Sequence, residues 1–218
     1  SLSNVTTYAF IIGFNHNASV EGTNRIHFQL AKTALTGGTD VCLCDSSYNS
    51  NVSTTGYFSM NSSRTSSGGW ASSQMRTNIC GTSLSSYSGT IIAVIPAALR
   101  AVLKSVTKYT DNTGGGSDTA SYVTSTTDLL PLLSEFEYHG ARYYANSAEK
   151  NYQAQYDYYR AGNSKVHYRH NATGTAAYAW CRSVYSGYHN RFCRVSTDGS
   201  ARASYAYYSW ALAPCFFV

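Results

Sequence analysis

Tyrosine, arginine and serine gather near the C-terminus of this 218-residue chain, where they could make a contact surface. The segment SYAYYSWALAPCFFV (204–218) places three tyrosines and a tryptophan before an apolar run. Tyrosine offers a large, stiff contact area for little rotamer entropy, and serine and asparagine adapt their hydrogen bonds, as in antibody loops. Arginine and tryptophan are common hot-spot residues. The pattern indicates a binding surface, although tyrosine in strands also serves as core packing.

Residue patterns for catalysis are not found in the sequence. It contains no GxSxG nucleophile motif and no HExxH zinc motif. His167 and His170 have basic neighbours and no nearby carboxylate, a poor match to a metal site. Glu135 and Glu137 could form an acid pair on one face of a predicted strand, but we interpret them as the surface end of that strand. The sequence predicts no enzyme, no cofactor and no metal.

The composition favours an extracytoplasmic β-rich protein. Charged residues make up 12% of the chain, against about 25% in typical soluble domains. Aromatic residues make up 14%, with 20 tyrosines against 8 phenylalanines, and serine, threonine, asparagine and glycine fill the polar positions. This mixture is typical of secreted, virion or cell-surface β proteins. The opening SLSNVTTYAF is typical of the interior of a larger protein or of a processed product.

The charge pattern does not predict nucleic-acid binding or membrane insertion. The net charge is +5, but in the C-terminal part the charges are single arginines among tyrosines rather than a basic run that could follow phosphates. No stretch approaches the roughly 20 apolar residues that cross a bilayer. The six cysteines include no CxxC pair and allow 15 disulfide pairings. We interpret them as free, buried thiols.

The elements that must position these residues form one α+β domain, residues 1–218. Apolar, β-branched runs predict strands at 6–16 and 24–33, and the polar stretch 45–68 predicts a long loop. Helices are expected at 68–80 and 91–106, the second with a buried stripe of Leu99, Val102 and Leu103. A strand is expected from 105, and another at 126–140, where Pro131 marks an edge or bulge. Short β segments follow.

Several motifs resemble a known family when taken in order. WCRS (180–183), FCRV (192–195), DGS (198–200) and APCFFV (213–218) look like the end of a C-type-lectin fold of the formylglycine-generating-enzyme-like branch. That branch includes the variable proteins of diversity-generating retroelements and phage tail fibre tips. IIGFNHN, GGWASSQMR, AALRAVLKSVTKYT and DLLPLLSEFEYHG are similar to a domain of unknown function common in gut bacteria and their prophages. The resemblance implies two helices packed on short antiparallel sheets, with many loops.

The resemblance also separates framework positions from ligand-contacting ones. It implies a framework role for Trp180, Arg182, Ser183, Phe192, Val195, Gly199, Ala203, Pro214, Phe216 and Val218. The residues between these anchors would contact the ligand. They are Tyr185, Tyr188, His189, Asn190, Arg191, Arg194, Ser196, Asp198, Ser200, Arg202, Ser204, Tyr205, Tyr207, Tyr208 and Trp210.

The sequence departs from the pattern of the resembled family in two respects. Adenine-directed mutagenesis of Asn-type codons ending in a pyrimidine cannot produce tryptophan, so Trp210 must be fixed or come from another codon. The calcium-lectin signatures EPN, QPD and WND are absent, which argues against a calcium-bridged sugar site.

The expected function is receptor binding at a phage tail fibre tip, in the virion. The domain would bind a protein or glycan on the host cell surface, and a homotrimer is the favoured assembly. A bacterial surface-displayed adhesin of the same fold is the first alternative. A structural virion protein without a receptor role, and an enzyme of the formylglycine-generating or another type, remain as further alternatives.

Overall fold

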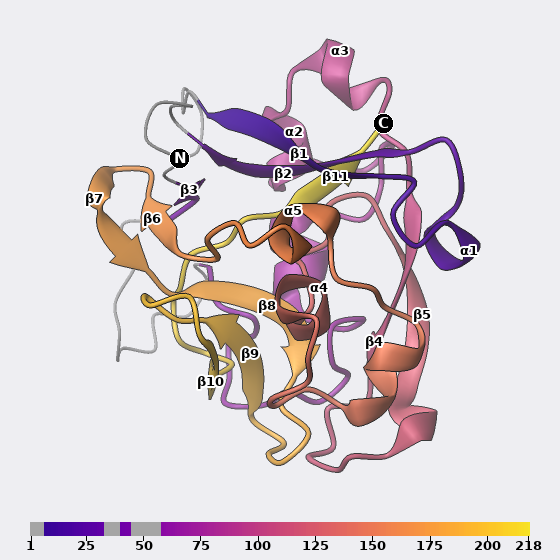
Figure 1. Cartoon of the computed structure of the whole chain (residues 1–218), viewed down its shortest axis with the longest axis vertical. Coiled ribbons are helices and arrows are strands. Elements are labelled where there is room, and N and C mark those ends of the chain that lie inside the picture. Colours follow the sequence, from indigo (N-terminus) through magenta and orange to yellow (C-terminus); the bar gives the residue numbers. More distant parts are fainter. Residues whose placement is uncertain (1–6, 33–39, 45–57) are drawn as a thin grey trace.

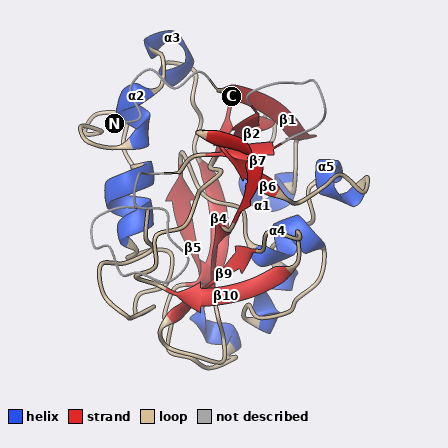
Figure 2. Cartoon of the chain, turned by 90° about the vertical axis from the view of Figure 1, so that its left-hand side faces the viewer, coloured by secondary structure: helices blue, strands red, loops and turns tan. Residues whose placement is uncertain are grey.

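The computed structural model describes residues 7–32, 40–44 and 58–218, and within them the predicted α+β class is confirmed (Figure 1). Strands occupy the middle of the molecule, with α2 (Ile91–Val94) on one side and α4 (Glu135–His139) and α5 (Asp157–Arg160) on the other (Figure 2). Most of the predicted loop, residues 45–57, lies outside the described residues, as does the start of the first predicted strand. None of the helices in the described part of the chain has the length and apolar character that spanning a membrane requires.

The first sheet joins the two ends of the described chain. Its strands β1 (Tyr8–Phe14), β2 (Ile26–Lys32) and β11 (Cys215–Phe217) run antiparallel in the order β1-β2-β11. Phe216 lies opposite Phe28, and their rings stack with centroids 5.0 Å apart. The strands predicted at 6–16 and 24–33 are therefore confirmed where they are described, and the closing apolar run is a core strand.

Two polar residues of β2 are buried more deeply than the apolar residues beside them. His27 and Gln29 are fully buried, whereas Phe28 and Leu30 are only partly buried. Gln29 donates to the Tyr138 hydroxyl at 2.8 Å and accepts from the Tyr159 hydroxyl at 2.5 Å. The alternation of this strand places its polar face against a hydrogen-bonded interior, where these bonds compensate the cost of burial.

The second sheet carries the predicted contact residues. Its antiparallel order is β10-β9-β8, built from β8 (Ala179–Val184), β9 (Arg191–Val195) and β10 (Ala201–Tyr205). All six residues of β8 are buried, so this strand fixes the sheet in the core and leaves β9 and β10 nearer the surface.

Two smaller sheets complete the β structure. β4 (Val106–Asp111) pairs antiparallel with β5 (Val123–Asp128), which confirms the strand expected after the second helix. The other sheet has the order β3-β6-β7, from β3 (Asp40–Cys42), β6 (His167–Arg169) and β7 (Ala172–Ala177). β3 and β6 are parallel, so the expectation that all sheets are antiparallel is wrong for this pair.

The predicted helices are shorter and more numerous in the structure. Only Met75–Cys80 of the segment 68–80 is helical, as a π-helix. The segment 91–106 splits into α2 and α3 (Ala97–Arg100) because Ile95, which precedes Pro96, is extended, the conformation that a following proline favours. The predicted buried stripe is partly wrong, since Val102 is 53% exposed. Short helices α1 (Ala18–Glu21) and α5, and 3₁₀ turns Ala120–Tyr122 and Ser147–Asn151, were not predicted.

The strand predicted at 126–140 is wrong after Asp128. The chain continues without regular structure through a buried leucine-rich stretch and enters helix α4 at Ser134. Ser134 Oγ accepts from the Glu137 N–H, and the Glu137 carboxylate accepts from the Ser134 N–H, which forms a capping box. Glu135 and Glu137 therefore lie on a helix and are buried, not at the surface end of a strand.

The core contains the predicted framework side chains and the thiols. Trp180, Phe192 and Phe216 belong to one apolar cluster with Trp70 and Trp210. A second cluster includes Cys181, Cys193 and Cys215, and the remaining cysteines are also buried. All six cysteines are free, which confirms the interpretation of the cysteines as buried thiols.

Candidate functional site

The predicted contact residues lie on β9, β10 and the loops beside them, at different depths. Tyr188, His189, Asp198 and Arg202 are exposed. Tyr185, Asn190, Arg191, Arg194, Ser196, Ser200, Tyr205, Tyr207 and Tyr208 are partly buried. Ser204 and Trp210 are buried, with exposed fractions of 8% and 2%, so the prediction that they belong to an exposed contact face is wrong.

Two arginines and two tyrosines form the centre of this surface, which we call the arginine–tyrosine cluster: Arg64, Tyr188, Arg191 and Tyr205. The Arg191 guanidinium lies 4.7 Å from the ring centroid of Tyr188 and 4.6 Å from that of Tyr205. The Arg64 guanidinium lies 3.9 Å from the Tyr205 ring centroid. Cation–π contacts of this kind contribute about 0.5–1 kcal/mol each at exposed sites.

Among the described residues, the guanidinium groups of the cluster have no carboxylate partner. Within the part of the chain that the structure describes, no acidic side chain forms an ion pair with Arg64 or Arg191. Arg191 donates to the Tyr205 hydroxyl at 3.2 Å, and this hydrogen bond lowers the pKa of Tyr205. The Nε atom of Arg191 is buried and has no hydrogen-bond partner within the described part of the chain. The cluster therefore presents two guanidinium groups on an aromatic surface, with no carboxylate partner for either in residues 7–32, 40–44 and 58–218.

A chain of aromatic rings connects the cluster to the core. Tyr205 stacks on Tyr207 at 6.0 Å, and both rings contact Tyr208, at 5.5 and 5.0 Å. The Tyr208 ring meets the Trp210 ring edge-on at 5.8 Å, and Trp210 packs 6.5 Å from Trp180. Trp210 is thus the buried support of the surface tyrosines, and this packing explains its small exposed fraction of 2%.

Five of the other predicted polar residues make hydrogen bonds to one another. Ser204 Oγ accepts from Arg194 Nε at 2.6 Å, and Arg194 Nη1 donates to Ser196 Oγ at 2.9 Å. Both the N–H and the hydroxyl of Ser200 donate to Asp198 Oδ1, which lowers the pKa of Asp198. These residues stabilise β9, β10 and the turn between them, and so they position the cluster.

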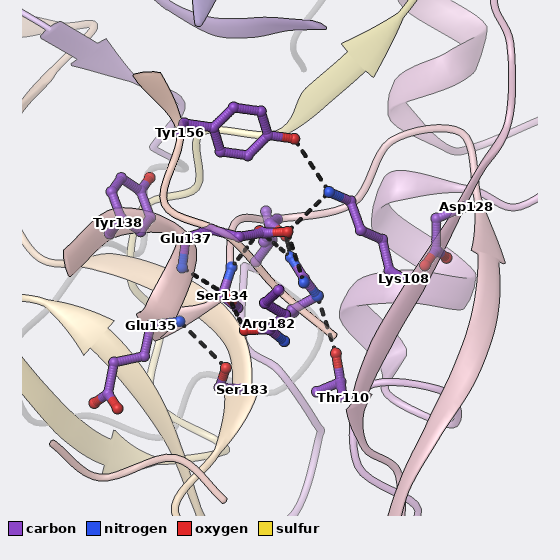
Figure 3. Close-up of polar contacts among 12 residues, drawn as sticks. Lys108, Thr110, Asp128, Ser134, Glu135, Glu137, Tyr138, Tyr156, Arg182 and Ser183 are labelled. Carbon is purple, nitrogen blue, oxygen red and sulfur yellow. Dashed lines mark hydrogen bonds and ion pairs between the residues drawn. The ribbon is translucent and has the colours of Figure 1, made fainter. Parts of the chain in front are cut away.

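An ionic core of buried charges contacts this sheet through Arg182 of β8. It consists of Lys108, Glu137 and Arg182, which Figure 3 shows, and of Glu21, which pairs with Lys108. Arg182 donates two hydrogen bonds to the Glu137 carboxylate, one of them from Nη2 at 2.9 Å. Lys108 Nζ donates to Glu137 Oε1 at 2.8 Å and to Glu21 Oε2 at 2.6 Å. Burial alone would raise the pKa of Glu137, but the charges of Arg182 and Lys108 outweigh burial and hold this pKa well below its usual range.

The same acids come close to the geometry of a metal site. His16, Glu21 and Glu137 each place one ligand atom within 4.8 Å of the others. The Lys108 ammonium lies between the two carboxylates and donates to both. Because Lys108 supplies the positive charge there, a metal ion would have to displace it.

The comparisons with known proteins identify a family. Residues 43–218 match the family described as Domain of unknown function (DUF6273). The chain belongs to the DUF6273 family. No curated protein and no solved structure matches it.

In this DUF6273 chain, Glu135 and Glu137, which the sequence predicted at the surface, contact strand β8. Arg182 lies on β8, and besides Glu137 it donates to Thr110 on β4 and to the Leu132 carbonyl, each at 2.9 Å. Glu135 accepts from the backbone N–H groups of residues 143–145 at 2.8–3.0 Å. The pattern S-x-x-E at Ser134–Glu137 is a sequence signal that could have revealed this helix start.

Arg64 of the DUF6273 chain was also missed. It is the one charged residue in the run NSSRTSSGG (61–69), and its own segment gives no reason to place it beside Tyr205. A long-range hydrogen bond from the Asn61 N–H to the Ala206 carbonyl, 3.0 Å, holds this segment against the end of β10. Only the tertiary structure therefore places Arg64 in the cluster.

Proposed function

We propose that this DUF6273 domain is a receptor-binding domain that attaches reversibly to a ligand on the host cell surface through the arginine–tyrosine cluster. The observation that carries the proposal is the pair Arg64 and Arg191, which both contact Tyr205 and have no carboxylate partner among the described residues. Guanidinium groups stacked on aromatic rings keep N–H edges available for anionic or polar ligand groups.

The framework of the cluster supports binding rather than chemistry. Arg182 and Glu137 neutralise each other in the interior, and the buried rings of Trp180 and Trp210 lie beneath the surface tyrosines. A rigid support reduces the entropy lost on binding, because the contact side chains are already ordered. The domain would hold its ligand and carry out no reaction.

The proposal extends to the fold, the assembly and the place of action. We assign the α+β domain to the C-type-lectin-like folds and place it at the tip of a phage tail fibre, as the order of the sequence motifs suggests. A homotrimer would present three copies of the cluster, and avidity would turn modest single-site affinities into firm attachment. A bacterial surface-displayed adhesin could use the same cluster, and neighbouring genes for tail assembly would separate the two.

The test is adsorption of the labelled domain to a panel of intact bacterial strains, measured by flow cytometry. Tyr205→Ala combined with Tyr207→Ala should abolish adsorption and leave the melting temperature almost unchanged, because both rings are only partly buried. Tyr8→Ala is the matched control: Tyr8 is a 46% exposed tyrosine on β1, in a different sheet from β10. It should bind like the unmodified domain. The proposal fails if no strain is bound, or if the double variant still adsorbs.

A further inference from the structure

A shallow polar hollow of about 370 Å³ lies beside the arginine–tyrosine cluster. Its lining consists only of asparagine, glutamine, serine and threonine residues, among them Asn61, Gln74, Thr77 and Asn78. Ser63 and Thr65, the neighbours of Arg64, also line it, and the Arg64 guanidinium contacts Tyr205. The hollow and the cluster are therefore adjacent parts of one surface.

Asn61 joins the walls of the hollow. Its side-chain Nδ2 donates to the Thr65 carbonyl at 2.7 Å, and its Oδ1 accepts from the Gln74 N–H at 3.1 Å. Its own N–H bonds to the Ala206 carbonyl beside the cluster. This one residue ties both lining segments to the end of β10, so the hollow exists before any ligand arrives.

The backbone around the hollow is fixed by close contacts. Gly69 has a φ of +53°, and a Cβ there would lie 2.1 Å from the Asp111 carbonyl oxygen. Trp70 and Met75 next to the lining residues are fully buried. A site held in this way loses little conformational entropy when a ligand binds.

A π-helix supplies one wall of the hollow. Thr77 and Asn78 belong to the π-helix Met75–Cys80 and present their side chains to solvent. π-helical turns are rare and occur frequently at functional sites. This observation is independent of the lining composition, and it points to the same place.

The lining chemistry selects the class of ligand. Amide and hydroxyl groups both donate and accept hydrogen bonds and carry no charge. Phosphates, carboxylates and metal ions bind most strongly to charged partners, and an apolar peptide anchor favours an apolar pocket. Sugar hydroxyl groups match this lining because each of them also donates and accepts. The volume of the hollow also lies within the range that small-ligand sites commonly have.

We propose that the hollow binds a neutral sugar unit of a host surface glycan, without calcium. This inference rests on the proposed receptor-binding function and names its ligand class. The cluster would contact the neighbouring part of the same glycan, where Tyr205 offers a ring face and Arg64 a guanidinium edge.

Gln74→Ala combined with Asn78→Ala removes two lining amides without removing a buried side chain. The control, Asn171→Ala with Thr173→Ala, removes an exposed amide and an exposed hydroxyl at the β6–β7 hairpin. Binding of each variant is measured on intact cells of an adsorbing strain and on capsular polysaccharide and lipopolysaccharide purified from that strain. The cells are also tested after periodate, which cleaves sugar diols, and after protease.

We expect the Gln74/Asn78 variant to bind cells, and at least one purified polysaccharide, at least tenfold more weakly than the unmodified domain. The control variant should bind like the unmodified domain. Periodate should abolish cell binding and protease should not. Loss of binding after protease alone, or full binding by the Gln74/Asn78 variant, overturns the glycan assignment. In that case, loss of adsorption in the Tyr205/Tyr207 variant still supports receptor binding. Failure to adsorb to any strain overturns the receptor-binding proposal itself.

Discussion

Replacing Arg182 by methionine would test the claim that the ionic core holds the β10-β9-β8 sheet in place. The guanidinium is fully buried and makes hydrogen bonds to Glu137, Thr110 Oγ1 and the Leu132 carbonyl. Methionine fills much of the volume but donates to none of these acceptors. Glu137 would keep Lys108 as a partner but would lose its bidentate one.

The expected loss of stability follows from the buried groups that Arg182→Met leaves without a partner. Breaking a buried ion pair by removing one partner costs about 3–5 kcal/mol, because an uncompensated charge stays in the interior. The Leu132 carbonyl and the Thr110 hydroxyl would also lose a donor, at about 1–3 kcal/mol for each buried polar group left unsatisfied. We therefore expect Arg182→Met to lower the free energy of unfolding by at least about 3 kcal/mol. The loss is large against a typical total of about 5–15 kcal/mol.

The assay is urea unfolding followed by the fluorescence of the three buried tryptophans. Arg160→Met is the control: the Arg160 side chain is 70% exposed in its pair with Asp157. Its loss should therefore cost less than about 1 kcal/mol. If Arg182→Met does not fold, Arg182→Lys keeps the charge without the planar fork and should show an intermediate loss. Glu137→Gln with Arg182→Met should be less destabilised than the sum of the single changes, by about 1–3 kcal/mol. An Arg182→Met variant within about 1 kcal/mol of the unmodified domain would refute the reasoning.

Two further predictions concern the backbone and acid stability. Gly69→Ala should cost about 3 kcal/mol or more, because its Cβ would overlap the Asp111 carbonyl at a positive φ. Gly174 has no atom near the position of an added Cβ, so Gly174→Ala should change the free energy of unfolding by no more than about 0.5 kcal/mol in the same assay. Between pH 7 and 4.5, acid stability depends on the buried His16, His27, His167, Glu21 and Glu149 and on the partly buried His139. Burial lowers the pKa of the first two histidines to about 3 and that of the other two to about 4, so each of the four costs stability as the pH falls below 6.5. Burial raises the pKa of Glu21 and of Glu149 to about 7, so each of the two adds stability as the pH falls from about 7 to 4.5. Together they offset the stability lost through two of the histidines in this pH range. Arg182 and Lys108 hold the pKa of Glu137 well below its usual range, so this group costs stability as the pH falls below about 4.5. The free energy of unfolding should therefore fall between pH 6.5 and 4.5 by the net effect of two histidines, and more steeply just below 4.5. A value that stays constant down to pH 3 would contradict this balance.

Strands with a regular apolar pattern could be predicted from the sequence. Residues 8–14, 26–32 and 106–111 form the strands expected from their β-branched and apolar residues. The faces were harder to assign. In β2, His27 and Gln29 point into a polar interior formed by Tyr138, Tyr156 and Tyr159, which lie more than 100 positions away in the chain. The alternating pattern of β2 shows that the two faces of the strand differ in polarity. It could not show that other parts of the chain cover the polar face as well as the apolar one.

Helix α4 was missed because of what precedes it. The run DLLPLL is apolar enough to indicate a buried strand, and SEFEYH continued the same interpretation. Local hydrogen bonds decided otherwise, since the capping box at Ser134 starts a helix whatever the hydrophobicity of the preceding residues. Burial of Glu137 then depends on Lys108 and Arg182, whose positions the local sequence does not encode.

In the C-terminal segment 204–218, too, some features could be predicted from the sequence and others depend on tertiary contacts. The apolar run CFFV was enough to predict a closing core strand, and the polar neighbours of the tyrosines before it led to the prediction of a surface position. Tertiary structure alone decided that Trp210 is buried beneath Tyr208, and that Arg64 reaches Tyr205 from a segment far away in the chain. The physical reason is that composition and periodicity report local preference, whereas burial and charge pairing depend on neighbours that only the folded chain brings together.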